Sequence, residues 1–334
     1  EGVTLTLASA DASAADLGMD KDSPSSRAPV PLKAWTLRFA GKPPATLKLR
    51  YQGRINHAIE QVGEEYARGF SQSPGIVDAR GAYLAGSTYW IPSFGDEYVT
   101  YRMTVTTPAG WRSVSQGSRV ASDDLEGRHR DTWVVDTPTE EIFVIAAAFT
   151  EYEFDAGAVK AMAFLREKDD ALANRYLETT AQYLEMYRKL IGPYPYGKFA
   201  LVENFWETGY GMPSFTLLGS QIIRFPFILH SSYPHELLHN WWGNGVFVDF
   251  ESGNWCEGLT AYMADHLVAE QRGQGDEYRR SALQAYTDYV SVGKDFPLSK
   301  FRSRDNAASQ AVGYGKATMT WNMLRGMVGD ETFV

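Results

Sequence analysis

Two histidines four residues apart, with a glutamate after the first, constrain this chain more than any other feature of its sequence. Residues 235–239 read HELLH. On an α-helix, residues i and i+4 lie on one face, so the imidazoles of His235 and His239 can reach one metal ion. Glu236 lies beside them and can face a water on that metal. Only 6 histidines occur in the chain. We therefore interpret the pattern as a metal site on a helix over 233–244, rather than as two unrelated histidines on a packed or surface helix.

A catalytic zinc site usually has three protein ligands and one water, so two histidines leave it incomplete. The next helix, expected over 255–270, begins near Glu257, which we predict to be the third ligand. An alternative is a capping box in which Glu257 accepts a hydrogen bond from the backbone of Asn254. Two other carboxylates lie in the connecting loop, Asp249 and Glu251. Histidines combined with a carboxylate favour Zn²⁺ over Mg²⁺ or Ca²⁺, which prefer oxygen-only shells, so we expect one Zn²⁺ per chain.

The composition restricts the remaining classes of function. The chain has 334 residues, of which 44% are hydrophobic and 22% charged, which is ordinary for a globular protein. Its net charge is −9, and without clustered Lys and Arg it is poorly suited to bind nucleic acid. The longest apolar run, residues 142–149, is far shorter than the roughly 20 residues of a membrane-spanning helix. Cys256 is the single cysteine, so we expect an inert buried thiol and no disulfide within the chain.

Hydrophobic periodicity changes along the chain and indicates two domains. The first half is rich in Val, Thr and aromatic residues between Gly and Pro turns, which predicts an antiparallel sheet or sandwich. Strands are expected over 34–40, 46–51, 97–105, 131–135 and 141–149. Apart from a strand expected at 199–204, the second half has helical periods. Helices are expected over 170–191, 233–244, 255–270 and 317–328. The predicted fold class is α+β, with a β domain over 1–154, in which 11–31 form a loop, and a mostly α domain over 155–334.

The sequence around HELLH resembles a known family. HELLHNWWGN followed by NWCEGLTAYMADHL is similar to the gluzincin metallopeptidases of the alanyl aminopeptidase and leukotriene-A hydrolase family. The matching residues are His235, Glu236, His239, Trp241, Gly243, Asn244, Glu257 and Gly258. Seventeen residues separate the second histidine from the glutamate, against eighteen in the family, which places a one-residue deletion within 245–253. The resemblance covers about 33–334 and is strongest over 192–330.

The resemblance implies a fold and a mechanism. The fold would be a saddle-shaped antiparallel β domain followed by a thermolysin-like, mostly α catalytic domain. Independently of the resemblance, a new segment, GDETFV, starts at residue 329 after the predicted helix over 317–328, so further residues are expected after the C-terminus. Glu236 would act as general base on a peptide or protein substrate. Residues 312–316, VGYGK, resemble the family's tyrosine segment, which assigns Tyr314 to oxyanion stabilisation. The family's range favours the bacterial periplasm or cell envelope over the cytoplasm, with any signal peptide outside this sequence. The oligomeric state is not implied.

One motif departs from the family. Its aminopeptidases carry Gly-x-Met-Glu-Asn before the metal-binding helix, and the Glu holds the free α-amine of the substrate. Here the stretch reads GYGMPS, with Pro213 in place of the Glu. Proline has neither a charge nor an N–H, so it cannot pair with an amine. Gly211 and Met212 remain the expected substrate-binding residues, and Glu207, or alternatively Glu203, is the candidate for a substitute carboxylate.

These residues leave three functions open: a zinc aminopeptidase, a peptidase without the amine anchor, and a non-catalytic zinc-binding scaffold. The second includes endopeptidases and relaxed-specificity enzymes, and predicts less than about tenfold discrimination between free and acetylated N-termini. The third would need neither Glu236 nor Tyr314. Around the metal, Asp265 is a candidate to orient a ligating imidazole. Asn240 and Asn244 are expected to fix the backbone at the end of the helix.

Overall fold

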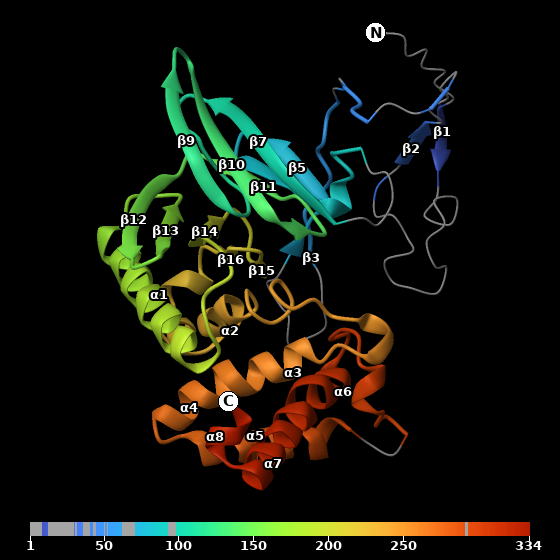
Figure 1. Ribbon diagram of the computed structural model, residues 1–334, viewed down its shortest axis with the longest axis vertical. Helices are drawn as coiled ribbons and strands as arrows, with labels where there is room; N and C mark the ends of the chain where they lie inside the picture. Colours follow the sequence, from blue (N-terminus) through green and yellow to red (C-terminus); the bar gives the residue numbers. More distant parts are fainter. Residues whose placement is uncertain are drawn as a thin grey trace.

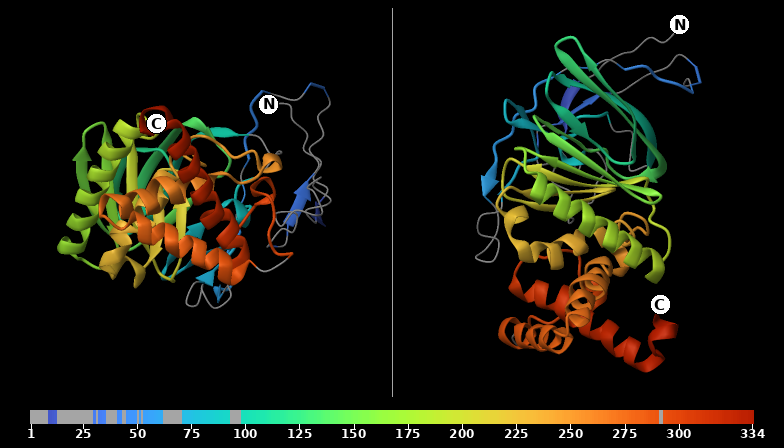
Figure 2. Two further views of the ribbon diagram at one scale, coloured as in Figure 1. Left: turned by 90° about the horizontal axis from the view of Figure 1, so that it is seen from below. Right: turned by 90° about the vertical axis from the view of Figure 1, so that its left-hand side faces the viewer.

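The computed structural model describes residues 9–12, 30, 32–35, 41–42, 45–49, 51, 53–61, 71–92, 98–290 and 293–334. The described part forms three layers (Figure 1). The sheets of the first half lie at the top of that view, a mixed sheet follows, and the helices of the second half lie below. The right-hand view in Figure 2 shows the same order, with the mixed sheet between the N-terminal strands and the helices. The predicted α+β arrangement, antiparallel sheets first and a helical region second, is confirmed.

The strands of the first half pair antiparallel. A three-stranded sheet has the order β7-β10-β9, a four-stranded sheet has the order β5-β6-β11-β8, and two separate pairs are β1-β2 and β3-β4. The bounds are β1 Ser9–Ala12, β2 Leu32–Trp35, β3 Glu60–Gln61, β4 Ser71–Gln72, β5 Gly75–Asp78, β6 Gly81–Leu84, β7 Val99–Pro108, β8 Arg112–Val114, β9 Ser118–Leu125, β10 Arg128–Thr139 and β11 Val144–Ala147. The strands expected at 97–105, 131–135 and 141–149 therefore overlap β7, β10 and β11.

The strand expected over 46–51 is wrong. Residues 46–49 and 51 lie outside any strand, and Leu49 is 41% exposed. Alternating apolar residues stabilise a strand through the neighbours they pack against, and this segment lacks a buried face. The strand expected at 34–40 is seen only as the end of β2, because residues 36–40 lie outside the described part. Of the loop expected over 11–31, the first two residues belong to β1, and all the others except Val30 lie outside the described part.

A five-stranded sheet forms the middle layer. Its order is β12-β13-β14-β16-β15; β13, β14 and β16 run parallel, and each outer strand pairs antiparallel with its neighbour. The bounds are β12 Thr150–Ala156, β13 Val159–Leu165, β14 Lys198–Asn204, β15 Gly209–Met212 and β16 Phe215–Gly219. Of these five strands the sequence predicts only β14, at 199–204. Strand β16 is also buried along its whole length, so it shows no polar alternation that would mark it as a strand. Helix α1 (Asp170–Leu190) confirms the helix predicted at 170–191. It connects β13 to the parallel strand β14, as a crossover between parallel strands requires.

The mixed sheet has a hydrophobic core on each face. One core packs against α1 and the helices below, and includes Tyr176, Phe199 and Leu237. The other packs against the N-terminal sheets, and includes Trp133 and Phe215. The expected boundary near residue 154 falls inside β12, whose partner β13 belongs to the second half. The middle sheet thus begins at residue 150, four residues before that boundary.

The remaining helices follow the middle sheet. Their bounds are α2 Ser232–Leu238, α3 Cys256–Thr260, α4 Leu267–Gln271, α5 Gly275–Tyr289, α6 Ala307–Gln310, α7 Ala317–Val328 and α8 Asp330–Phe333. The helix expected over 255–270 consists of α3, the π-helical turn η8 (Ala261–His266) and α4. A second π-helical turn, η10 (Ala311–Lys316), leads into α7, which confirms the helix predicted at 317–328. The helix expected over 233–244 is shorter than predicted, because the N–H of Asn244 donates back to the carbonyl of His239 and closes a turn.

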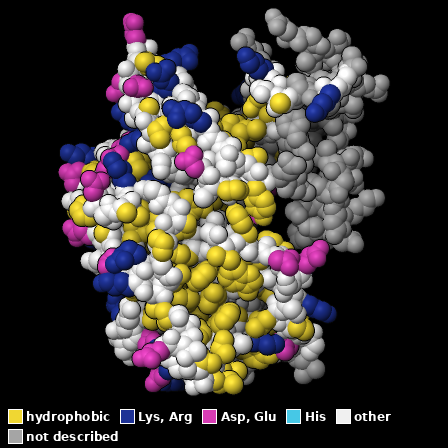
Figure 3. All heavy atoms as spheres, in the orientation of Figure 1, with side chains coloured by type: hydrophobic (Ala, Val, Ile, Leu, Met, Phe, Trp, Pro, Cys, Tyr) yellow, Lys and Arg dark blue, Asp and Glu magenta, His cyan; other side chains and the backbone are white. Residues whose placement is uncertain are grey.

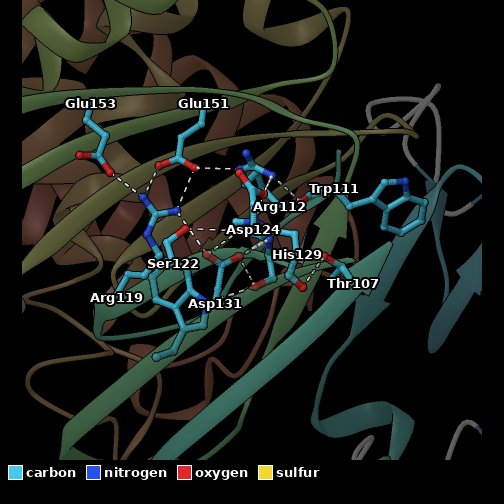
Figure 4. A network of polar contacts seen from close by, with 12 residues as sticks. Thr107, Trp111, Arg112, Arg119, Ser122, Asp124, His129, Asp131, Glu151 and Glu153 are labelled. Atoms are coloured by element: carbon cyan, nitrogen blue, oxygen red, sulfur yellow. Dashed lines mark hydrogen bonds and ion pairs between the residues drawn. The ribbon is translucent and has the colours of Figure 1, made fainter. Parts of the chain in front are cut away.

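A charged network joins the N-terminal sheet to the middle sheet (Figure 4). Arg119 of β9 donates hydrogen bonds to Glu151 and Glu153 of β12, and its guanidinium lies 3.6 Å from Asp131 of β10. Asp131 is fully buried and also contacts Nε2 of His129 at 3.1 Å. Because these groups come from both layers and are largely buried, the network fixes the position of one layer on the other.

Hydrophobic side chains also gather on the lower, helical part of the face shown in Figure 3. An apolar groove of about 430 Å³ in this part of the fold is lined by Leu190, Ile191, Trp242, Leu259, Met263, Trp321, Leu324, Val328, Thr332, Phe333 and Val334. None of the predicted metal ligands lines it. Among the described helices, none combines the length and apolar character needed to cross a bilayer.

Candidate metal centre

The three predicted ligands converge on one point between two helices. His235 lies in the last turn of α2, His239 is the C-terminal cap of that helix, and Glu257 lies in the first turn of α3. The Nε2 atoms of His235 and His239 lie 3.3 and 3.4 Å from Oε2 of Glu257, and the three donor atoms lie within 4.8 Å of one another. Across the described ranges, no other group of three His, Cys, Asp or Glu side chains has this arrangement. Two nitrogens and one carboxylate oxygen match the three protein ligands of a catalytic zinc.

The alternatives for the third ligand make other contacts. The exposed carboxylate of Asp249 accepts hydrogen bonds from the backbone and a hydroxyl of its own turn, and Glu251 is exposed in the same turn. The backbone N–H of Asn254 donates to the carbonyl of Phe301, so it does not form a capping box with Glu257. Of these carboxylates, the structure brings Glu257 to the two histidines.

Close packing places Tyr314 beside the ligands. A Cβ atom on Gly258 of α3 would lie 2.3 Å from the Cβ of Ala317 and 2.9 Å from the carbonyl oxygen of Gly313. Only glycine permits this approach between α3 and η10. Tyr314 lies in η10, and its ring stacks on the imidazole of His235 with centroids 6.2 Å apart and planes 18° apart. Burial and the negative charge of Glu257 raise the pKa of Tyr314, so its hydroxyl stays protonated and can donate a hydrogen bond.

Each ligating imidazole has a partner on its Nδ1 atom. His235 Nδ1 lies 3.0 Å from Asp265 Oδ2, on the π-helical turn η8, so the contact expected of Asp265 is present. His239 Nδ1 lies 3.1 Å from the carbonyl oxygen of Trp242. Donation from Nδ1 leaves each Nε2 atom with a lone pair directed to the metal position. The thiol of Cys256 donates to the same carbonyl of Trp242 and lies 3.3 Å from His239 Nδ1. The sequence did not indicate this contact, because a helical neighbour of Glu257 is expected to point away from the ligands.

The pKa values of the predicted ligands are those expected of groups that release protons when a metal cation binds. Burial disfavours the charged imidazole of His235, but the charge of Asp265 and the hydrogen bonds of Asp265 and Glu257 raise its pKa to about 10. Burial also opposes ionisation of Glu257, yet its hydrogen bonds to the two histidines hold its pKa well below the usual range. Metal binding at such ligands displaces protons, so we expect zinc affinity to rise with pH.

Glu236 lies against the edge strand of the middle sheet. A Cβ atom on Gly211 of β15 would be only 2.4 Å from Glu236 Oε2 and 3.5 Å from Cδ2 of His239. The strand backbone therefore passes directly beside the carboxylate. Burial raises the pKa of Glu236, an effect that the charges of the two histidines oppose. A carboxylate whose proton affinity is raised is suited to accept and return a proton.

The other candidates for substrate contact lie elsewhere. Met212 is 4% exposed and packs in the core between the middle sheet and the N-terminal sheets. The carboxylate of Glu207 accepts the backbone N–H groups of residues 221 and 222. Glu203 is buried, forms an ion pair with Arg224 at 2.8 Å, and accepts the backbone N–H of Arg166. Both glutamates are therefore engaged by groups of the fold.

The chain has local sequence similarity to aminopeptidases. No protein-family model matches it. It is 28% identical over 107 residues to "Aminopeptidase 2, mitochondrial" of Saccharomyces cerevisiae, which is 30% of this chain and 11% of that protein. It is also 28% identical over 130 residues to "Aminopeptidase RNPEPL1" of Homo sapiens, which is 36% of this chain and 18% of that protein. The matched segments thus span less than a fifth of these relatives.

Solved structures are similar over a larger part of the chain. An M1 zinc metallopeptidase from Deinococcus radiodurans has a TM-score of 0.59 at 21% identity, covering 80% of this chain and 62% of that one. A mutant M1 zinc metallopeptidase from the same organism, bound to a Tyr-Ser-Ala substrate, has a TM-score of 0.61 at 19% identity, covering 83% and 64%. This chain therefore shares the fold of M1 zinc metallopeptidases, has local sequence similarity to aminopeptidases, and brings His235, His239 and Glu257 together in a cluster that could hold a metal ion.

Proposed function

We propose that this chain hydrolyses peptide bonds as a zinc-dependent peptidase of the aminopeptidase type. The observation that carries the proposal is the convergence of His235, His239 and Glu257, with Glu236 beside them and Tyr314 stacked on the same site. A metal-binding scaffold needs the first three residues only. A buried carboxylate and a protonated phenol beside the metal position are the groups that hydrolysis requires in addition.

The chain's own residues divide the reaction between them. Zinc held there would supply a Lewis acid that polarises the scissile carbonyl and acidifies water. Glu236 takes one proton from the attacking water as its oxygen bonds to the carbonyl carbon. Glu236 then gives this proton to the leaving nitrogen as the C–N bond breaks. The hydroxyl of Tyr314 donates a hydrogen bond to the carbonyl oxygen as negative charge develops there. Among the described strands, β15 has a neighbour on one side only, so its outer edge can pair with an extended peptide.

The position of the substrate's N-terminus decides between exopeptidase and endopeptidase. Pro213 cannot bind an amine, and the contacts of Glu203 and Glu207 engage both substitute carboxylates within the fold. A charged hydrogen bond to the amine would contribute roughly 1.5–3 kcal/mol, or about 10–150-fold in specificity. Without it, we propose that free and acetylated N-termini are discriminated by less than about tenfold.

The proposal extends to the organisation of the chain. We assign residues 1–154 to an N-terminal β domain of the saddle type and residues 155–334 to a thermolysin-like catalytic domain. The order β12-β13-β14-β16-β15, with its outer strand beside α2, supports this assignment. Strand β12 begins at residue 150, so the catalytic sheet starts slightly before this boundary.

One set of measurements tests the proposal. The purified protein should contain about one zinc per chain and hydrolyse Tyr-Ser-Ala. Glu236→Gln should retain the zinc and lose at least about a hundredfold in turnover, because it removes the proton acceptor but keeps the shape. Matched free and acetylated Tyr-Ser-Ala then give the ratio of kcat/KM values. A protein that binds zinc but hydrolyses neither peptide would favour the non-catalytic scaffold, and a strong preference for the free amine would contradict the proposed lack of an anchor.

A further inference from the structure

A lysine is buried at the boundary between the N-terminal sheets and the middle sheet. Lys198, the first residue of β14, is 2% exposed. Its amine lies over the rings of Trp133 and Phe215, at 5.2 and 5.3 Å from their centroids. Its hydrogen bonds go to the hydroxyl and the carbonyl of Ser214, at 2.7 and 3.0 Å. Within the described part of the chain, no carboxylate acts on this amine, and the charge that faces it is the guanidinium of Arg119.

Such a residue is unfavourable for stability. Burial drives the pKa of Lys198 well below its usual value, so holding this group inside the fold costs free energy. A methionine would fill the same apolar space without that cost. Ser214 would not be left without partners, because its carbonyl also accepts the N–H of Ala200 and its hydroxyl oxygen the N–H of Gly117. The presence of a lysine at this position is therefore not explained by the stability of the fold.

Ser214 forms the tight turn between β15 and β16. It has a φ of 67°, in the left-handed region that non-glycine residues seldom occupy. Gly117, whose N–H binds the hydroxyl of Ser214, lies between β8 and β9 of the N-terminal sheets. Non-glycine residues with this backbone conformation persist where the surroundings hold them, and they cluster at functional sites. Here Lys198 and Gly117 hold the turn from two sides.

The other side of the turn is fixed to the metal-binding helix. The N–H of Ser214 donates to Oδ1 of the buried Asn240 at 2.6 Å. The amide of Asn240 in turn donates to the carbonyl of Leu237, at 2.9 Å, at the C-terminal end of α2. Asn240 directly follows His239 in the sequence. Hydrogen bonds through Ser214 and Asn240 thus connect Lys198, the first residue of β14, to the end of the helix that carries HELLH.

We infer that Lys198, Ser214 and Asn240 form a positioning latch that sets the distance between strand β15 and the general base. The inference rests on the proposed peptidase function. Gly211 lies in strand β15, three residues before Ser214 in the turn. Its backbone lies beside the carboxylate of Glu236. If the turn shifts, the strand shifts with it, and both the carboxylate and the bound peptide lose their relative position. Misplacement by about 1 Å can cost about a hundredfold in rate.

The test is Lys198→Met, compared with Lys160→Met as a control. Lys160, on the neighbouring strand β13, is 46% exposed and pairs with Glu153, so its replacement should change little. In Lys198→Met we expect kcat to fall roughly 10–100-fold with KM changed less than about threefold. Zinc content should be unchanged and the thermal midpoint equal to or above that of the wild type. Hydrogen exchange of segment 209–216 should become faster in this variant, which is a readout independent of turnover.

A second variant covers the case in which Lys198→Met does not fold. Ser214→Gly keeps the left-handed turn without strain but lacks the hydroxyl, and the same fall in kcat is expected. The double variant should lose little more than either single one, because both act through one contact. Unchanged kcat with unchanged exchange of segment 209–216, or a fall in kcat fully explained by lost zinc, would overturn the latch. If the wild type hydrolyses no peptide, or if Glu236→Gln leaves its turnover unchanged, the proposed function is wrong. Hydrogen exchange of segment 209–216 in Lys198→Met and in the wild type would then test the latch without reference to turnover.

Discussion

The contact between Gly211 and Glu236 gives the sharpest test of the site. A methyl group at position 211 would place Cβ 2.4 Å from Glu236 Oε2. Ordinary contacts between carbon and other heavy atoms begin near 3.5 Å, so in Gly211→Ala the carboxylate oxygen must retreat by about 1 Å. The same Cβ would be 3.5 Å from His239 Cδ2, which is an ordinary contact. The substitution therefore displaces the general base and leaves the metal ligands in place.

The expected cost falls on activity rather than on stability. The displaced atom is the end of a flexible side chain, so the fold accommodates the methyl with a change of about 0.5 kcal/mol or less in unfolding free energy. The loss of turnover should be about a hundredfold, because the proton acceptor no longer lies where the attacking water must be deprotonated. Since the misplaced group acts in the transition state, kcat should fall and KM should change little.

Turnover, zinc content and thermal midpoint of Gly211→Ala are compared with those of Gly209→Ala. A Cβ on Gly209, in the same strand, would only meet Leu218 Cδ2 at 3.8 Å, so this control should behave as the wild type. If Gly211→Ala keeps full kcat, Glu236 is not confined by β15 and the geometry of the base is wrong. If zinc is lost in Gly211→Ala alone, the strand supports the ligands rather than the base.

Three further outcomes follow from the site and from Lys198. Glu257→Gln should weaken zinc binding more than any change outside the ligand set, as measured by competition with a chelator; unchanged affinity would make another carboxylate the ligand. Asp265→Ala should weaken zinc binding by about 10–100-fold through the imidazole of His235, and an unchanged dissociation constant would show that the Asp265 contact is incidental. The pKa of Lys198 is lowered in the fold, so below pH 10.5 the unfolded chain binds more protons than the folded one. The free energy of unfolding of the wild type should therefore increase with pH toward 10.5, by up to about 1.4 kcal/mol per pH unit. Urea unfolding at pH 7 and 9.5 should therefore show the stability advantage of Lys198→Met shrinking, whereas a constant difference would mean a charged amine in the fold.

The features that depend on local geometry could be predicted from the order of residues. Helix α1 and helix α7 follow from apolar residues repeated at helical spacing, and both have the predicted extent within one residue. The spacing of four between His235 and His239 places both imidazoles on one face because a helix turns every 3.6 residues. Glu257 could be singled out because a zinc site needs a third ligand and the next helix begins there.

Which distant groups meet became clear only from the packed fold. Strand β16 is missed because it is buried along its whole length and shows no polar alternation. The segment 46–51 alternates like a strand but has no core to face, so its prediction is wrong. The contact of Ser214 with Gly117 spans 97 positions in the sequence, and no local pattern encodes it. Local periodicity records which face of an element is apolar. The partner of that face is set by the packing of all layers at once. This packing places Gly211 against the general base and brings the buried Lys198 into hydrogen-bond contact with Ser214.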